Sequence, residues 1–414
     1  MQYWKKLNPE EIRKRVFTAL GQNVDFRQPH VLGIPASHLD DKVFYSEAPF
    51  LKEAPYLATL LHNPNHIGCH TLGKSEHFFA GTQAIEREVI ELLATDLLQA
   101  EPGTTDGYVA SGGTEANTQA MWMYRNEFMR EHGAELNEIA ILCSADSHYS
   151  MPKAANLLQV SHYAVAVEDD TRAIKANSVA ETLDRATAEG KRYFIVVANM
   201  MTTMFGSVDD PNVYTHALDE RELTYRLHVD GAYGGFFYPV AATQTPLTLA
   251  NPKVSSVTLD AHKMLQAPYG TGIFLTRKGL IGYTHTEEAQ YVEGQDTTLI
   301  GSRSGANAVA VWMILQSYGP HGWFEKIQTL LQRTLWLTRQ LDQLGVRYFH
   351  DPFANIVTMR AEDLPSNLAN RYGLVPDEHD NPHWFKIVVM DHVTVDAMAP
   401  FVQELQEELA GVAN

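Results

Sequence analysis

Apolar and polar residues alternate along the chain with a period that changes several times from about residue 80 onward. In GTQAIEREVIELLATDLL, Ile85, Val89 and Leu92 recur at helical spacing, so this stretch predicts a helix. Thr82 precedes the apolar positions and is the expected N-cap. Apolar residues recur in the same way after SGGTEAN, where a second helix is predicted.

Short apolar runs lie between these helix-length segments. They are YVA (108–110), IAILCS (139–144), HYAVAV (162–167), YFIVVANM (193–200), YRLHVDGA (225–232), SSVTLDA (255–261) and GIFLTR (272–277). Runs that are apolar at nearly every position are typical of strands buried on both faces, so the alternation predicts an α/β fold with a mainly parallel sheet. Ligands of such sheets bind at the carboxyl ends of the strands.

The C-terminal part has a different organisation. The helix-rich stretch 305–344 ends at Gly345, and it is followed by the strand-like ANIVTMRA and FKIVVM and by a helix from about 395 to 409. This tail predicts a second, smaller α+β domain.

Composition and charge narrow the possible functions. The chain has 414 residues, 45% of them hydrophobic, and is long enough to bury a large core. The net charge of -18 argues against nucleic acid or an anionic membrane as a partner, because phosphate binding needs basic patches. Two cysteines, Cys69 and Cys143, are too few for a disulfide framework. Without a signal peptide or an apolar run of roughly 18 residues, the protein is expected to be cytoplasmic.

Four motifs place reactive groups at predicted strand ends. SGGTEAN opens a helix with small residues that could surround an anion, and HVDGAYGG puts Asp230 at the end of a strand. DSHYSMPKAA sets His148 just past another strand, and TLDAHKMLQAPYGTG isolates Lys263 among uncharged residues. Taken singly, each motif also fits a structural role: a capped helix, a turn-capping aspartate, a hydrogen-bonded histidine or a surface lysine.

Together the four motifs match the needs of one cofactor, pyridoxal 5'-phosphate (PLP). Its phosphate needs an anion site, its ring nitrogen an acidic partner, its flat face a cover and its aldehyde a lysine amine. We expect Lys263 to bond the aldehyde, Asp230 to face the ring nitrogen and His148 to stack on the ring. No metal is expected.

The order of these motifs resembles that of the group II PLP-dependent amino acid decarboxylases. TTLIGSRSGANAVAVWMILQSYGPHGW and FKIVVMDHVT look like the archaeal tyrosine/aspartate decarboxylase branch. The resemblance implies the aspartate aminotransferase-like PLP fold (fold type I), with a seven-stranded sheet. It also implies three parts: a dimer-embracing extension (1–60), a large PLP-binding domain (61–304) and a small C-terminal domain (305–414).

The resemblance also assigns residues. Gly113 and Thr114 would bind the phosphate, and Ser302 would reach the phosphate in the neighbouring subunit of a homodimer with shared active sites. The other cofactor-binding positions that it implies, besides His148 and Asp230, are Thr202, Ala232, His262 and Lys263. Tyr291, in EAQYVEG, resembles the loop tyrosine that protonates the product in related enzymes; a surface tyrosine without chemistry is the alternative.

Three positions depart from the family pattern. Gly231 stands where an alanine is usual, and Met201 stands where a glycine is usual and would reshape the pocket. Lys386 replaces an arginine thought to hold the substrate's α-carboxylate, so the charge is kept but the bidentate fork is lost. Lys386 could therefore bind the substrate or be an exposed strand lysine.

A histidine-rich segment, LLHNPNHIGCHTLGKSEHFF, precedes the first predicted helix. Pro64 and Gly68 interrupt the helix that a metal site with histidines four residues apart would need. His66 is therefore expected to line the substrate entrance, with purely structural histidines as the alternative.

The sequence thus predicts an L-amino acid α-decarboxylase acting on aspartate, tyrosine or glutamate and releasing the amine and CO2. A PLP-dependent aminotransferase or carbon–carbon lyase on the same scaffold is the alternative enzyme. A binding protein without activity is disfavoured by the intact lysine, Lys263.

Overall fold

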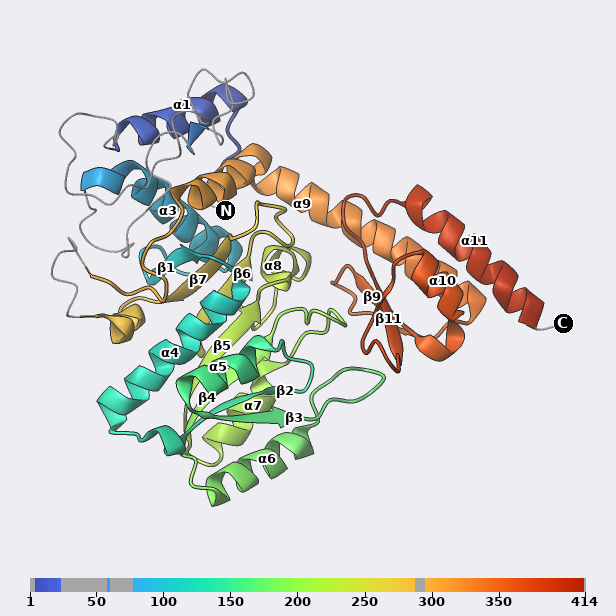
Figure 1. The fold of residues 1–414 in the computed structure, drawn as a ribbon, viewed down its shortest axis with the longest axis horizontal. Coiled ribbons are helices and arrows are strands. Elements are labelled where there is room, and N and C mark those ends of the chain that lie inside the picture. Colours follow the sequence, from blue (N-terminus) through green and yellow to red (C-terminus); the bar gives the residue numbers. More distant parts are fainter. Residues whose placement is uncertain (1–3, 24–57, 60–76, 287–294, 413–414) are drawn as a thin grey trace.

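The computed structural model describes residues 4–23, 58–59, 77–286 and 295–412. Figure 1 shows a large α/β body and a smaller unit of strands and helices, which the long helix α9 (Gly305–Leu344) connects.

Seven strands of the described chain form one sheet in the order β1-β7-β6-β5-β4-β2-β3. Their bounds are β1 Thr105–Ala110, β2 Ile139–Ser144, β3 Ser161–Val165, β4 Tyr193–Asn199, β5 Thr224–Gly231, β6 Val254–Asp260 and β7 Gly272–Arg277. Neighbouring strands from β3 to β6 pair in parallel, whereas β7 runs antiparallel to both β6 and β1. The predicted α/β fold with a mainly parallel seven-stranded sheet is confirmed.

Both faces of this sheet are covered by helices, as the apolar strands require. Alternate strand residues enter two separate cores: Ile141 packs with α4 (Gly113–His132) and α5 (Ser150–Leu158). Leu142 belongs to the opposite core, which includes α3 (Ala80–Leu92), α6 (Ala176–Ala188) and α7 (Pro211–Asp219). The sheet is therefore a buried central layer.

Two helices differ from the sequence-based expectation. Helix α3 begins at Ala80, so the N-cap prediction for Thr82 is wrong; its hydroxyl donates instead to the carbonyl of Phe79, at 3.2 Å. Helix α1 (Pro9–Gly21), which the pattern analysis did not predict, starts behind a capping box of Asn8 and Glu11 and packs against α3.

The smaller unit has its own sheet and core. Its antiparallel strands lie in the order β10-β11-β9-β8, with bounds β8 Tyr348–Phe349, β9 Ile356–Arg360, β10 Val375–Pro376 and β11 Trp384–Val388. Helices α10 (Ser366–Arg371) and α11 (Val395–Val412) and the end of α9 complete it. The predicted small C-terminal domain is present, whereas the boundary at 304/305 stays a prediction, because Val309 and Trp312 of α9 pack in the core of the large sheet.

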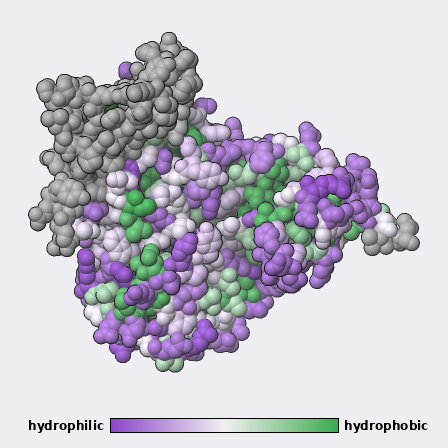
Figure 2. All heavy atoms as spheres, viewed as in Figure 1, coloured by the Kyte–Doolittle hydropathy of each residue, from purple (hydrophilic) through white to green (hydrophobic). Residues whose placement is uncertain are grey.

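The visible surface is mainly hydrophilic, with apolar atoms in separate patches (Figure 2). No helix in the described ranges is long and apolar enough to cross a bilayer. Over the same residues, histidine, cysteine and acidic side chains form no group that could hold a metal ion.

Candidate active site

A small hollow lies where the carboxyl ends of β4, β5 and β6 meet. The described residues that line it are His148, Asn199, Met201, Thr202, Thr203, Asp230, Ala232, Tyr233 and Lys263. Five of these residues were expected at the site from the sequence: His148, Thr202, Asp230, Ala232 and Lys263. The sheet thus brings together side chains that are up to 115 positions apart in sequence (263 − 148).

Lys263 lies on a turn that directly follows β6. Its backbone N–H donates to the carbonyl of Asp260 at 3.1 Å, and the N–H of Gln266 donates to the carbonyl of Lys263 at 3.2 Å. Gln266 then adopts a left-handed φ of 57°, which ends the turn. These bonds hold the backbone on both sides of Lys263 while its half-buried side chain lines the hollow.

Asp230 is the last residue but one of β5 and is only 7% exposed. One oxygen, Oδ2, accepts a hydrogen bond from Nδ2 of Asn117 at 2.8 Å, and Oδ1 accepts one from the backbone N–H of Ala232 at 3.0 Å. Each oxygen keeps a further lone pair, so the carboxylate is fixed in orientation and can still accept a donor from the hollow.

His148 follows β2, and its ring faces the same space. Its Nδ1 accepts from the N–H of Ser150 at 3.2 Å and lies 2.9 Å from the Ser150 hydroxyl. Burial lowers the pKa of His148, the carboxylate of Asp230 opposes that change, and Lys263 and Lys153 add to it. The result is a ring that is predominantly neutral near pH 7.

The start of α4 packs closely against the ends of neighbouring strands. A Cβ added at Gly113 would lie 3.0 Å from Cβ of Ala232, and one at Gly272 would lie 2.3 Å from the backbone of Gly112. The N–H of Gly113 donates to Oδ2 of Asp260 at 3.0 Å, and Nδ1 of His262 lies 2.7 Å from Oδ1 of the same carboxylate. The next first-turn amide, that of Thr114, has no intrahelical acceptor and points toward the helix N-terminus.

The opposite wall is a tight turn after β4. Met201 adopts a left-handed φ of 66°. The Thr202 hydroxyl lies 2.7 Å from that of Ser207, and its backbone N–H donates to the Ser207 carbonyl at 2.9 Å. The turn thereby presents the carbonyl of Thr203 outward.

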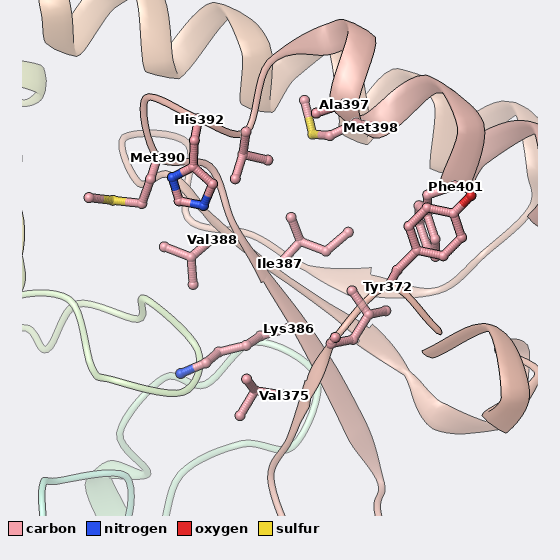
Figure 3. A pocket seen from close by; sticks show the side chains of 13 residues that line it. Tyr372, Val375, Lys386, Ile387, Val388, Met390, His392, Ala397, Met398 and Phe401 are labelled. Carbon is pink, nitrogen blue, oxygen red and sulfur yellow. The ribbon is translucent and has the colours of Figure 1, made fainter. Parts of the chain in front are cut away.

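Lys386 reaches this turn from β11 of the small domain. Its Nζ donates to the carbonyl of Thr203 at 2.7 Å, and Figure 3 shows the side chain extending from β11 toward the large-domain loops. Burial, and then the charge of Lys263, lower the pKa of Lys386. The two lysines are therefore within electrostatic reach of each other.

A larger hollow of about 400 Å³ lies between β11 and the start of α11 (Figure 3). Its lining is mostly apolar, with Val388, Met398 and Phe401 among its members, and Lys386 lies on its rim. Of the site residues predicted from the sequence and described in the structure, Lys386 alone lines it, so the chemistry belongs to the smaller hollow.

Several polar residues of the site were not found from the sequence. Asn117 contacts Asp230, Asn199 lines the hollow, and buried His228 contacts Asn117 through Nε2 at 3.0 Å. A signal did exist for two of them. His228 lies two residues before Asp230 on a strand, and Asn117 lies one turn after Gly113 on a helix, so each shares a face with an expected site residue.

Other expected residues lie elsewhere. Ser302 is exposed on the segment before α9, and it does not line the hollow. Tyr291 and His66 lie outside the described residues.

Residues 76–350 match the model of the pyridoxal-dependent decarboxylase conserved domain. The chain belongs to this family. Among its relatives is a tryptophan decarboxylase of Clostridium sporogenes, 49% identical over 98% of both chains. A probable L-tyrosine/L-aspartate decarboxylase of Methanocella arvoryzae is 31% identical over 86% of this chain and 94% of the relative.

Solved structures agree with the fold of this pyridoxal-dependent decarboxylase. The L-methionine decarboxylase of Streptomyces sp. 590 superposes with a TM-score of 0.70 over 84% of this chain and 88% of the other, at 20% identity. The enzyme decarboxylates an amino acid with PLP as its cofactor. The residues in place suit PLP, because the amine of Lys263 and the fixed carboxylate of Asp230 line one hollow. The start of α4 lies against Ala232 in the same wall, at a distance that only a glycine at position 113 allows.

Proposed function

We propose that this decarboxylase acts on an aromatic L-amino acid, L-tryptophan first, and releases the arylalkylamine and CO2. The observation that carries the proposal is the 49% identity over nearly the whole chain with a tryptophan decarboxylase. Of the three substrates expected from the sequence, tyrosine shares the aromatic ring, whereas aspartate and glutamate carry a second carboxylate.

The charges around the hollow support a neutral substrate side chain. Lys263 is the only lysine or arginine among the described residues that line the hollow. Lys386 adds one more cation beside Thr203. If Lys263 serves the cofactor and Lys386 the α-carboxylate, the described wall offers no further lysine or arginine for a side-chain carboxylate. Met201 and Tyr233 instead offer apolar surface.

Lys386 is proposed to hold the α-carboxylate of the substrate. Its ammonium has three donors, of which one is used by the carbonyl of Thr203. The remaining donors could bind a carboxylate close to the hollow, because Thr203, which holds Lys386, lines it. This arrangement would hold the carboxylate that leaves as CO2 near the cofactor-binding lysine.

The cofactor roles expected from the sequence are proposed for the same residues. Lys263 would bind the cofactor covalently, Asp230 would face its ring nitrogen and His148 would cover the ring. Once bound, PLP would draw away the electron pair that departing CO2 leaves behind. Gly113, Thr114, Thr202, Ala232 and His262 would complete the cofactor-binding surface, and His66 would line the substrate entrance.

Tyr291 is proposed to deliver a proton to Cα of the product. If so, Tyr291→Phe should still bind cofactor and substrate but form amine far more slowly, and more turnovers should end in pyridoxamine phosphate. Both are measured by product analysis and by absorbance of the bound cofactor. An unchanged rate and an unchanged product ratio would remove Tyr291 from the reaction.

A homodimer with shared sites is also proposed. Ser302 is exposed, as are the neighbouring apolar residues Leu299 (38%) and Ile300 (43%), which suits a surface that a second copy covers. Two inactive variants, Lys263→Ala and Ser302→Asp, should regain activity when they are unfolded and refolded together, because one mixed site has both residues intact. No recovery, although differently tagged subunits co-purify as mixed dimers, would place Ser302 in the site of its own subunit.

The substrate proposal is tested with purified enzyme, added PLP and a panel of L-tryptophan, L-phenylalanine, L-tyrosine, L-aspartate and L-glutamate. Amine and CO2 formation should give L-tryptophan a kcat/KM at least about 100-fold above that of either acidic amino acid, because an unpaired carboxylate is costly to bury. A higher kcat/KM for aspartate or glutamate would overturn the assignment.

A further inference from the structure

A chain of buried polar side chains extends behind Asp230, away from the hollow. It runs through Asn117 on α4, His228 on β5, Ser256 on β6 and Tyr124 on α4, all at most 1% exposed. The donor–acceptor distances are 2.8 Å from Asn117 to Asp230, 3.0 Å from His228 to Asn117, 2.7 Å between Ser256 and His228, and 2.6 Å from Tyr124 to Ser256.

The donor and the acceptor of each of these hydrogen bonds can be deduced from Asp230, the carboxylate at the end of the chain of side chains. Ionised Asp230 only accepts, so Asn117 must present its amide N–H, which turns Oδ1 toward Nε2 of His228. Nε2 must then carry the proton, which it can share with the hydroxyl of Thr258 at 3.3 Å. This leaves Nδ1 of His228 to accept from Ser256, whose oxygen accepts from Tyr124.

The same amide also reaches His148. Nδ2 of Asn117 lies 3.1 Å from the hydroxyl of Ser150, and that hydroxyl lies 2.9 Å from Nδ1 of His148. The backbone N–H of Ser150 donates to Nδ1, so Nδ1 is an acceptor. The Ser150 hydroxyl accepts from Asn117, which leaves its proton available to donate to Nδ1 as well. The ring proton of His148 is thereby directed to Nε2.

We propose that Asn117 and His228 are positioning residues that set the hydrogen-bonding state of both side chains flanking the cofactor: Asp230 as an acceptor-only carboxylate and His148 as the Nε2–H tautomer. The proposal rests on the roles proposed above for Asp230 and His148. Burial supports it, because it lowers the pKa of His228 to about 4 and keeps that ring neutral, with one donor and one acceptor.

Three variants test the proposal. His228→Phe removes the donor to Asn117, so the amide can rotate and present its oxygen to Asp230. His228→Gln keeps an N–H near the position of Nε2. Tyr124→Phe is the matched control, because it removes an equally buried polar group from the far end of the chain and leaves the bonds from Ser256 to Asp230 in place.

Two readouts do not depend on turnover. The ¹⁵N shifts of His148 in the protein freed of cofactor report its tautomer, and titration of the same protein with PLP gives the cofactor Kd. His228→Phe should give mixed tautomers and a Kd raised about 10- to 100-fold, as expected for losing a hydrogen bond to a charged group. His228→Gln and Tyr124→Phe should keep one tautomer and a Kd within about threefold of wild type.

The proposal is overturned if folded His228→Phe keeps the single tautomer and the wild-type Kd, or if Tyr124→Phe changes both as much as His228→Phe does. If His228→Phe does not fold, Asn117→Asp replaces it. That change keeps the shape but sets two carboxyl groups side by side, and unchanged tautomer and Kd would again overturn the proposal. Neither readout uses a substrate, so this outcome is separate from the tryptophan assignment.

Discussion

The two sides of the active site are built differently. On the cofactor side, Asp230, Asn117 and His228 are at most 7% exposed, lie on the large sheet and α4, and bond to one another. On the substrate side, Lys386 comes from a second sheet and is held by one hydrogen bond to exposed Thr203. With the roles proposed above, the buried layer would fix the chemistry, and substrate choice would be left to residues that can change without disturbing that layer.

Removing the charge at the centre of the buried side should have the largest effect. Asp230→Asn keeps the shape but loses the carboxylate, so we expect kcat to fall about 10²- to 10³-fold. Initial rates of CO2 release at saturating PLP measure this loss. Asp230→Glu, which keeps the charge, should retain more activity. An Asn variant within tenfold of wild type would contradict the assigned role of Asp230.

The same buried layer should make stability depend on pH. Burial lowers the pKa of His228 to about 4, from about 6.5 when unfolded, so the unfolded chain binds the extra proton between these values. The contribution of His228 to the free energy of unfolding should therefore be highest above pH 6.5 and fall by about 3 kcal/mol as the pH drops toward 4. Urea unfolding of wild type and of His228→Gln at pH 7 and pH 4.5 measures this contribution. A difference between the two proteins that does not change with pH would refute it.

If Lys386 holds the substrate as proposed, Lys386→Met should raise KM about 10- to 30-fold and change kcat little, since it would remove a charged hydrogen bond to the bound substrate. Lys386→Arg should keep KM low, because its fork suits a carboxylate. Lys153→Met is the control, since it removes an exposed cation that acts on His148 but does not line the hollow. Steady-state kinetics with the preferred substrate distinguish these variants. Equal KM for Lys386→Met and wild type would leave Lys386 as a structural lysine.

The smallest expected effect concerns the turn at Met201. Its φ of 66° costs a non-glycine residue about 1 kcal/mol, so Met201→Gly should be more stable than Met201→Ala by about that amount. Both variants lose the same buried thioether side chain, which makes them a matched pair. Urea unfolding gives the comparison, and an Ala variant as stable as the Gly variant would mean that the turn relaxes.

The strands of the large sheet could be predicted from the sequence better than the short strands of the small domain. The limits of β2 and β7 agree with the apolar runs, because strands buried on both faces leave a continuous signal. The antiparallel direction of β7 has no such signal, because a buried strand reads alike in both directions. The two-residue strands β8 and β10 were missed, since they are too short to show a period.

For the site, motifs at strand ends predicted Lys263, Asp230 and His148, which line one hollow. The chain of buried polar side chains behind Asp230 was missed, because the sequence does not show which partner a histidine or asparagine in apolar surroundings will contact in the fold. The contact of Lys386 with Thr203 depends on how the small sheet docks, which local patterns do not encode.

The pairing of β1 with β7 has a consequence for how the enzyme is made. Gly112, which precedes α4, packs against Gly272 at the start of β7, so this part of the proposed cofactor site forms only after about two thirds of the chain has left the ribosome. Joining strands so distant in sequence is an intrinsically slow folding step. PLP should therefore bind only chains in which β1 and β7 have paired. A larger supply of PLP should then shift the folding equilibrium toward these chains by mass action.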